Sequence, residues 1–223
     1  MLVWFLNLNR IRCVSMFFVF EGVDGAGKTT QLQLFAEWLN SLGHRVVTCQ
    51  DPGSTQLGEE VRRLLLGSHQ TPIHMRTEMM LFTTARTQLV EEIIKPALLV
   101  GQTVVLDRYI LSTVVYQGHA GNLKPDDVWT VNRIATDGLL PDVTFVLDLD
   151  VQTASQRMGK SLDRMESRGA VYFEKVRQGF IHEAQRWPDR VELIDAAQSV
   201  SDMQAEIRQL ASGYLARRNN DKI

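Results

Sequence analysis

The sequence has little of three features that mark common classes of protein. Its 223 residues include 24 Lys and Arg against 26 Asp and Glu, so no basic surplus points to a nucleic-acid partner. No stretch reaches the roughly 20 apolar residues that span a bilayer. The two cysteines, Cys13 and Cys49, lack the spacing of a metal site. We therefore expect no nucleic-acid or membrane partner, and a protein of the reducing cytoplasm.

The first fifteen residues stand apart from the pattern that follows them. They contain a short apolar run that Asn7 interrupts, and a signal peptide would be cleaved inside the first expected strand. We reject export on this ground. We expect residues 1–15 to be a disordered extension, or a start-site artefact with Met16 as the true first residue. Residues 16–217 are expected to form a single domain, and 218–223 a polar tail.

Short apolar runs alternate with longer stretches of helical periodicity along the chain. The runs expected as strands are 17–20, 45–49, 103–106, 142–149 and 190–194. Helices are expected at 28–42, 55–66, 74–100, 111–117, 125–138, on either side of 159–169, and at 200–217. Pro96 should kink or end the helix in which it lies. The alternation predicts an α/β fold, with a parallel sheet covered by helices on both faces and ligands beyond the carboxyl ends of its strands.

A glycine-rich loop follows the first expected strand. Residues 22–29 match the pattern G-x-x-x-x-G-K-[ST] in full, and a chance match on a structural glycine turn is the alternative. In such a loop, backbone N–H groups and a helix N-terminus surround phosphate oxygens. Lys28 would reach the β- and γ-phosphates of ATP, and Thr29 would bind Mg²⁺. The expected ATP-binding residues of the loop are Gly22, Val23, Asp24, Gly25, Ala26, Gly27, Lys28, Thr29 and Thr30.

Asp107 and Arg108 end the third expected strand. A carboxylate at this place can face the phosphate loop and hold Mg²⁺, and the planar guanidinium beside it can bind a phosphate dianion. The alternative is a surface ion pair at the end of a strand. The sequence contains no Asn-Lys-x-Asp segment, which a GTPase would need to read guanine.

Six segments, taken in order, carry a more specific signal. They are FEGVDGAGKTT (20–30), DPGSTQLGEEVR (51–62), LFTTARTQLVEEIIKPAL (81–98), LDRYILSTVVYQG (106–118), PDVTFVLDLD (141–150) and LDRME (162–166). Together they resemble the thymidylate kinase family, in its bacterial type, from about Met16 to Leu215. The resemblance implies a P-loop NTPase fold with a five-stranded parallel sheet and a small mobile lid at about 159–169. It also implies transfer of the γ-phosphoryl group of ATP to dTMP, and a homodimer formed by helix packing, which the helices at 55–66 and 74–100 could support.

The resemblance also assigns residues to an acceptor pocket. Phe82 and Arg86, four apart on one helix face, would stack on thymine and read its edge. Phe82 could instead belong to the apolar stripe of its helix. Thr113 and Gln117 would line the base and deoxyribose pocket, or could equally be solvated. Asp24 would bind the 3′-hydroxyl group of the acceptor.

Three positions depart from the family pattern. Asp51 stands where Glu is usual, and it could still face the metal or the acceptor. Gln50 stands where related bacterial sequences often have Arg, so one phosphate contact is missing or comes from Arg62. Gly25 occupies a position from which some family members supply an arginine.

Catalysis is expected to depend on positioned cations. The resemblance brings the lid arginines Arg164 and Arg168 to ATP, although they could instead pair with acidic neighbours in a solvated loop. Arg108 would hold the acceptor phosphate, which needs no general base because its second pKa is about 6. The expected catalytic residues are Lys28, Asp107, Arg108 and Arg164. Two other functions stay open, namely phosphorylation of a different nucleotide and a nucleotide switch with no acceptor.

Overall fold

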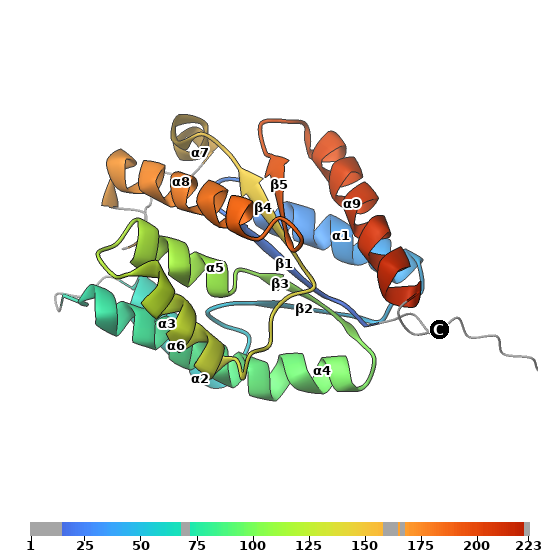
Figure 1. Ribbon diagram of the computed structural model, residues 1–223, viewed down its shortest axis with the longest axis horizontal. Coiled ribbons are helices and arrows are strands. Elements are labelled where there is room, and N and C mark those ends of the chain that lie inside the picture. The colour runs from blue at the N-terminus through green and yellow to red at the C-terminus, as the bar shows by residue number, and fades with distance from the viewer. Residues whose placement is uncertain (1–14, 68–71, 158–164, 166–167, 221–223) are drawn as a thin grey trace, which may run out of the picture.

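A parallel sheet organises the protein. The computed structural model describes residues 15–67, 72–157, 165 and 168–220. Among these, the strands are β1 (Phe17–Gly22), β2 (Val46–Gln50), β3 (Thr103–Asp107), β4 (Val143–Asp148) and β5 (Val191–Asp195). They form one five-stranded sheet in the order β2-β3-β1-β4-β5, and all neighbours are parallel (Figure 1). The predicted sheet is confirmed.

Helices connect the strands. They are α1 (Lys28–Ser41), α2 (Gln56–Leu66), α3 (Met75–Leu89), α4 (Lys95–Leu99), α5 (Ile110–Thr113), α6 (Pro125–Ala135), α7 (Val151–Arg157), α8 (Ala170–Arg186) and α9 (Val200–Asn220). Two π-helical segments, η1 (Val90–Ile94) and η2 (Val114–His119), follow α3 and α5. None of the helices in the described part of the chain has both the length and the apolar composition needed to cross a bilayer.

The expected helix at 74–100 changes from α-helical to π-helical and back along its length. The chain stays helical from α3 through η1 into α4, so Pro96 neither ends nor begins it. The π-helical turns lie immediately before Pro96, which has no N–H to donate. At the other end of the chain, α9 runs to Asn220, so part of the segment expected as a polar tail is helical.

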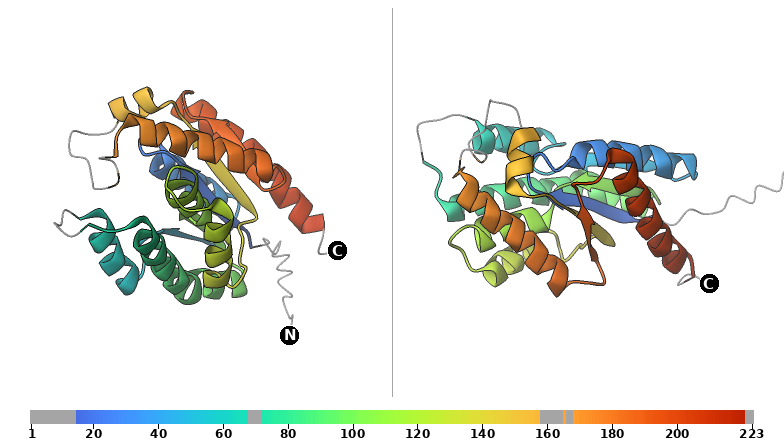
Figure 2. Two further views of the ribbon diagram at one scale, coloured as in Figure 1. Left: turned by 60° about the vertical axis from the view of Figure 1, so that its left-hand side comes forward. Right: turned by 90° about the horizontal axis from the view of Figure 1, so that it is seen from above.

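The central strand β1 is buried on both faces, because its side chains alternate between two cores. Phe18 and Phe20 pack with Phe35 of α1 in one core, to which α8 and α9 also contribute. Phe17 and Val19 lie in the other core, with side chains of α3, η1, α4 and α6. Figures 1 and 2 show α1 and α9 on one side of the sheet and α3 and α4 on the other.

The strand register brings the carboxyl ends of three strands to one edge of the sheet. Asp107, the last residue of β3, pairs with Phe20 of β1 and with Gln50 of β2. The glycine-rich loop follows β1, the segment from Asp51 follows β2, and Asp107 and Arg108 stand at the end of β3. The three motifs therefore lie together, as the sequence predicted.

Candidate functional site

The glycine-rich loop leaves no space for a side chain at one of its turns. Gly25 has φ 81°, and a Cβ atom on it would lie 2.6 Å from the carbonyl oxygen of Ala154. Both the positive φ and the close carbonyl oxygen favour glycine at this position. An arginine here, as in some family members, would need the loop or the backbone at Ala154 to shift from its present position. α1 begins at Lys28, directly after the loop, so the positive end of its dipole faces the loop. No side chain caps this helix end.

Lys28 is buried inside this loop. Its Nζ donates to the carbonyl oxygens of Gly22 and Val23, at 3.1 and 2.9 Å, and lies 3.7 Å from Asp24 Oδ1. Burial lowers the pKa of Lys28, and the nearby charge of Arg108 lowers it further against the pull of the surrounding carboxylates. The lysine is thus a cation held at the centre of a backbone cradle that suits phosphate oxygens.

Two oxygen ligands of the kind that Mg²⁺ prefers meet at the sheet edge. Thr29 Oγ1 donates to Asp107 Oδ2 at 3.1 Å. A hydroxyl and a carboxylate at this separation could bind one hard cation together, directly or through water. Asp51 lines the same cavity, but its Oδ2 accepts from Arg86. The structure therefore brings Thr29 and Asp107 together and directs one oxygen of Asp51 elsewhere.

Arg108 links the glycine-rich loop to the opposite wall of the site. Its Nη1 donates to Gly22 O and to Ser112 Oγ, both at 3.0 Å, and its Nη2 donates to Asp24 Oδ1 at 2.5 Å. The backbone of Arg108 has φ 67°, a conformation that non-glycine residues adopt at a cost of about 1–3 kcal/mol. This conformation directs the guanidinium across the site, where it also lies over the Tyr116 ring.

Asp24 is held in its ionised form. Burial alone would raise the pKa of this carboxyl, but the charges of Arg108 and Lys28, with hydrogen bonds from Arg108 and Tyr116, outweigh it and lower the pKa to about 2. The Tyr116 hydroxyl donates to Asp24 Oδ2 at 3.4 Å. Asp24 therefore offers negative charge and acceptor oxygens at neutral pH.

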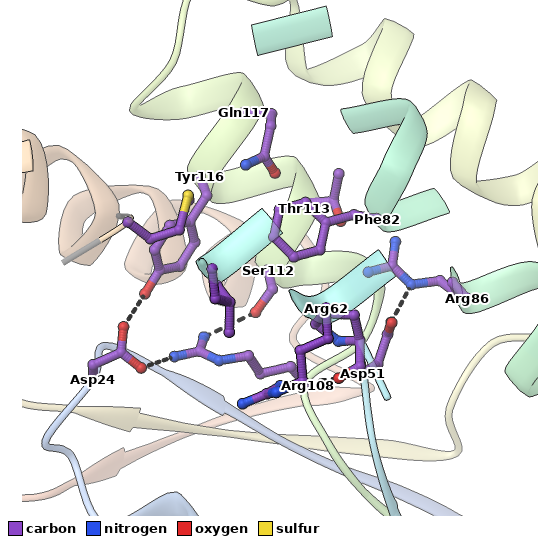
Figure 3. Close-up of a pocket in the computed structure, with 13 residues that line it drawn as sticks. Asp24, Asp51, Arg62, Phe82, Arg86, Arg108, Ser112, Thr113, Tyr116 and Gln117 are labelled. Carbon is purple, nitrogen blue, oxygen red and sulfur yellow. Dashed lines mark hydrogen bonds and ion pairs between the residues drawn. The ribbon is translucent and has the colours of Figure 1, made fainter. Parts of the chain in front are cut away.

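A second cavity adjoins Arg108 and Asp24 (Figure 3). Its walls come from the loop itself, the segment after β2, α2, α3, α5 and η2. Three buried polar atoms of its lining residues have no hydrogen-bond partner within the described residues, namely Asp51 Oδ1, Thr113 Oγ1 and Gln117 Oε1. Unsatisfied buried polar atoms are rare, so three in one cavity indicate a site built for a polar ligand.

Arg86 is fixed at the far wall of this cavity. Its side chain is 1% exposed, its Nε donates to Asp51 Oδ2 at 2.5 Å, and its Nη1 donates to Asn132 Oδ1. The guanidinium of Arg86, which extends from α3, is thus held by Asp51 from the loop after β2 and by Asn132 from α6. Removal of Asp51 would leave the buried charge of Arg86 uncompensated, and removal of Asn132 would leave one of its N–H groups without this acceptor.

Gln117 is oriented by a buried carboxylate. Its Nε2 donates to Glu78 Oε1 at 2.8 Å, while Arg168 Nη2 donates to Glu78 Oε2 at 2.6 Å. Because the amide nitrogen is held by Glu78, the amide oxygen is the atom left for the cavity. Arg168 also donates to the Tyr172 hydroxyl, which in turn donates to the carbonyl oxygen of Tyr116.

Phe82 belongs both to the cavity and to a small apolar cluster. It lines the cavity and packs against Val61, Leu65 and Ala85. Both interpretations of this residue are therefore compatible with its position. Arg62 donates to the carbonyl oxygen of Pro52 at 2.9 Å and lines both cavities. Gln50, which stands where related bacterial sequences often have Arg, lines the cavity at the glycine-rich loop together with Arg62.

The two predicted lid arginines have different outcomes. Arg164 lies outside the described residues, as does most of the expected lid. Arg168 lies beside Glu78 at the acceptor side, and it is absent from the described lining of the cavity at the glycine-rich loop, where Arg157 is present. Its expected contact with ATP stays a prediction.

Sequence reasoning did not find several residues that organise the site. The clearest is Glu21, which is fully buried and accepts from the backbone N–H groups of Tyr109 and Ser112, at 2.8 and 3.1 Å, and from the Ser112 hydroxyl. Burial raises the pKa of this carboxyl, although the charge of Arg108 opposes it. The signal was a lone charge in the apolar run FFVFEG. The others missed were Glu78, Ser112, Tyr116 and Asn132.

A family model described as "Thymidylate kinase" matches residues 20–207 of this chain. The chain belongs to the thymidylate kinase family. The thymidylate kinase of Thermosipho africanus is 40% identical over 201 residues, which cover 90% of this chain and 99% of that protein. That of Rhodopirellula baltica is 42% identical over 183 residues, which cover 82% and 74%. The crystal structure of the Ehrlichia chaffeensis thymidylate kinase matches with a TM-score of 0.72 at 30% identity, covering 89% of this chain and 99% of that one.

Proposed function

We propose that this chain transfers the γ-phosphoryl group of ATP to dTMP, giving ADP and dTDP, with Mg²⁺ bound at Thr29 and Asp107. The observation that supports this most strongly is that two cavities adjoin. The cavity at the glycine-rich loop and the cavity with the three unsatisfied polar atoms share lining residues, namely Asp24, Asp51, Arg62 and Arg108. Two phosphate-bearing ligands bound in these two cavities would meet at Arg108. In a member of this family, ATP would occupy the cavity at the glycine-rich loop and the acceptor nucleotide the other.

The chemistry needs no proton transfer. An oxygen of the acceptor phosphate forms a bond to the γ-phosphorus, and the bond from that phosphorus to the β–γ bridging oxygen breaks, which leaves ADP. The acceptor oxygen is already largely ionised, since the second pKa of a phosphate monoester is about 6. Lys28 stabilises charge on the β- and γ-phosphates, and Arg108 holds and orients the acceptor phosphate. Bound Mg²⁺ would neutralise charge on the same oxygens.

The orientation of Gln117 supports selection of a thymine base. Gln117 lines the cavity, and its Oε1 is buried without a partner among the described residues, so a ligand that reaches it would have to supply a donor. The N3–H group of thymine or uracil is such a donor, whereas N3 of cytosine is an acceptor. An unmatched pair of acceptors in a buried site costs about 1–3 kcal/mol or more. Thr113 Oγ1, also unsatisfied, can serve a second polar atom of the nucleoside.

For the lid, we propose that Arg164 contributes charge to the phosphates of ATP, as the LDRME segment implies. Arg168 is proposed to act at the acceptor side instead, because its guanidinium is bound to Glu78 and lies over the Tyr172 ring. The two arginines thus form a matched pair for comparison. Substitution of Arg164 should lower turnover, and substitution of Arg168 should weaken dTMP use through Gln117.

A second copy of the chain is the proposed partner of the α2, α3 and α6 layer. These helices pack side by side, and Leu57, Met80 and Ile134 on them are 40%, 47% and 77% exposed. Exposed apolar side chains on neighbouring helices are a feature that an interface between two copies would bury. Met80→Glu should then shift the sedimentation coefficient towards the monomer. We also propose a cytoplasmic location, which fits the free, buried thiol of Cys49.

An acceptor panel tests the proposed activity. ADP release is followed at fixed ATP and MgCl₂ with dTMP, dUMP, dCMP, AMP or GMP as the acceptor. We expect dTMP to give the highest kcat/KM and dCMP to be among the poorest. Faster turnover with a purine monophosphate would assign the chain to another acceptor. Slow ADP release that dTMP leaves unchanged would indicate a switch protein.

A further inference from the structure

A second cluster of metal-ligating groups lies where η2 packs against α8, outside the site described above. His119 is the last residue of η2, and His182 and Glu183 are neighbours on α8. One ligand atom from each residue lies within 4.8 Å of the other two. None of the three residues lines either cavity of the proposed active site.

The close approach of the two elements depends on a glycine. A Cβ atom on Gly179 would lie 2.8 Å from Cβ of His119, so only glycine lets α8 come so near. His182 and Glu183 lie three and four residues after Gly179, on the same face of the helix. Their side chains therefore meet His119 as a consequence of this packing. The two imidazole rings have centroids 5.0 Å apart.

Glu183 is already oriented as a metal ligand would need to be. It is fully buried, and its Oε2 accepts from the indole N–H groups of Trp129 and Trp187, at 3.1 and 3.2 Å. Its other oxygen, Oε1, faces His119 Nε2 at 2.7 Å. N–H donors that hold a ligating carboxylate by its other oxygen are a regular part of metal sites.

Arg186 is a cation beside the cluster, and its guanidinium is shared between Glu183 and Asp126. Arg186 Nη1 lies 3.8 Å from Glu183 Oε1, but its Nη2 donates to Asp126 at 2.9 Å. The side chain of Arg186 is 40% exposed, so its guanidinium can move towards Asp126 and water. The cluster thus keeps two imidazoles and one carboxylate oxygen for a shared ligand.

We propose that His119, His182 and Glu183 bind one divalent transition-metal ion of the Zn²⁺, Co²⁺ or Ni²⁺ kind. Two imidazoles with one carboxylate suit these ions, while Mg²⁺ and Ca²⁺ prefer oxygen ligands alone. His182 is exposed, so solvent water can complete the coordination. The ion would join η2 to α8. Because Tyr116 and Gln117 also belong to η2, it would steady the element that carries part of the acceptor pocket.

Zinc binding by the full chain tests this proposal. Zn²⁺ is titrated against a chromophoric chelator in excess Mg²⁺, which saturates the oxygen site at Thr29 and Asp107. We expect one Zn²⁺ per chain at a site that His182→Ala weakens at least about tenfold. His74→Ala is the matched control, because His74 is exposed and its side chain makes no capping hydrogen bond. This control should bind as the parent does.

Thermal unfolding gives an independent readout. At Zn²⁺ about a hundredfold above Kd, the Tm of the parent should rise by roughly 5–10 °C, and that of His182→Ala should rise much less. Co²⁺ should bind with the visible absorption of a low-coordinate complex. Equal Zn²⁺ affinity and equal Tm shifts in the parent and His182→Ala would overturn the proposal, whichever activity the chain has.

Discussion

The two halves of the proposed active site are built in different ways. The donor half is a continuous loop, in which backbone atoms, one lysine and the start of α1 surround the place for a triphosphate. The acceptor half combines side chains from four or more segments, and its polar groups hold one another through pairs such as Arg86 with Asp51 and Gln117 with Glu78. The donor half is therefore sensitive to added atoms, and the acceptor half to lost partners.

Substitution of the loop lysine should have the largest effect, because Lys28 Nζ is held at the loop carbonyl oxygens of Gly22 and Val23, where the donor phosphates would bind. Lys28→Ala should lower kcat by about 10³-fold or more. Steady-state ADP release with saturating dTMP measures it. The far-UV circular dichroism spectrum serves as the folding control. Turnover within tenfold of the parent would remove Lys28 from the mechanism.

An added methyl group should break the donor half alone. Gly25→Ala introduces a Cβ 2.6 Å from Ala154 O, at φ 81°, so the loop must move and the affinity for ATP should fall by about 10²-fold. Gly213→Ala in α9 is the control, since a Cβ there meets nothing within 4 Å. Equilibrium binding of an ATP analogue reports the difference. Unchanged affinity in Gly25→Ala would show that the cradle tolerates side chains.

Arg108 lines both cavities, so its substitution shows which of the two ligands depends on it more. Arg108→Ala should raise the KM for dTMP by about 10–100-fold and leave the KM for ATP within a few-fold, because the guanidinium faces the acceptor cavity. Arg108→Lys should restore only part of the loss, since lysine lacks the planar fork. Equal increases in the two KM values would contradict this, because they would show that Arg108 serves the donor and the acceptor alike.

Loss of one polar atom should damage the acceptor half alone. Gln117→Leu removes the Oε1 acceptor and leaves Glu78 without one donor, so we expect the KM for dTMP to rise about tenfold, with little change for ATP. Gln152→Leu, at an exposed position of α7, is the matched control. If Gln117→Leu uses dTMP as well as the parent does, the base is read by other groups.

The smallest expected effect is on stability, and it concerns the carboxylate between the two halves. The pKa of Asp24 is lowered from 3.8 to about 2, so its contribution is present above pH 4 and is lost as pH falls towards 2. The contribution is at most about 2–3 kcal/mol, and less because Asp24 is partly exposed. Asp24→Asn should therefore show a shallower loss of unfolding free energy between pH 5 and pH 3 than the parent. Parallel curves from urea titrations would contradict this.

The same contrast explains what the sequence could predict. The glycine-rich loop was found because its chemistry lies in consecutive residues with a fixed spacing, and the sheet because buried parallel strands are continuous apolar runs. Glu78 and Asn132 were missed because each is one polar residue on a helix whose partner lies far away in the chain. The position of Arg168 beside Glu78 depends on how the chain returns to α8, which local pattern does not specify.

The central claim is that two phosphate-bearing ligands meet at Arg108. The most direct measurement supplies purified chain with ATP, dTMP and Mg²⁺ and quantifies ADP and dTDP in the same samples over time. The account predicts that dTDP and ADP accumulate in equal amounts, and that both slow together in Arg108→Ala. ADP that accumulates without dTDP would contradict it, because water rather than the arginine-held phosphate would then be the acceptor.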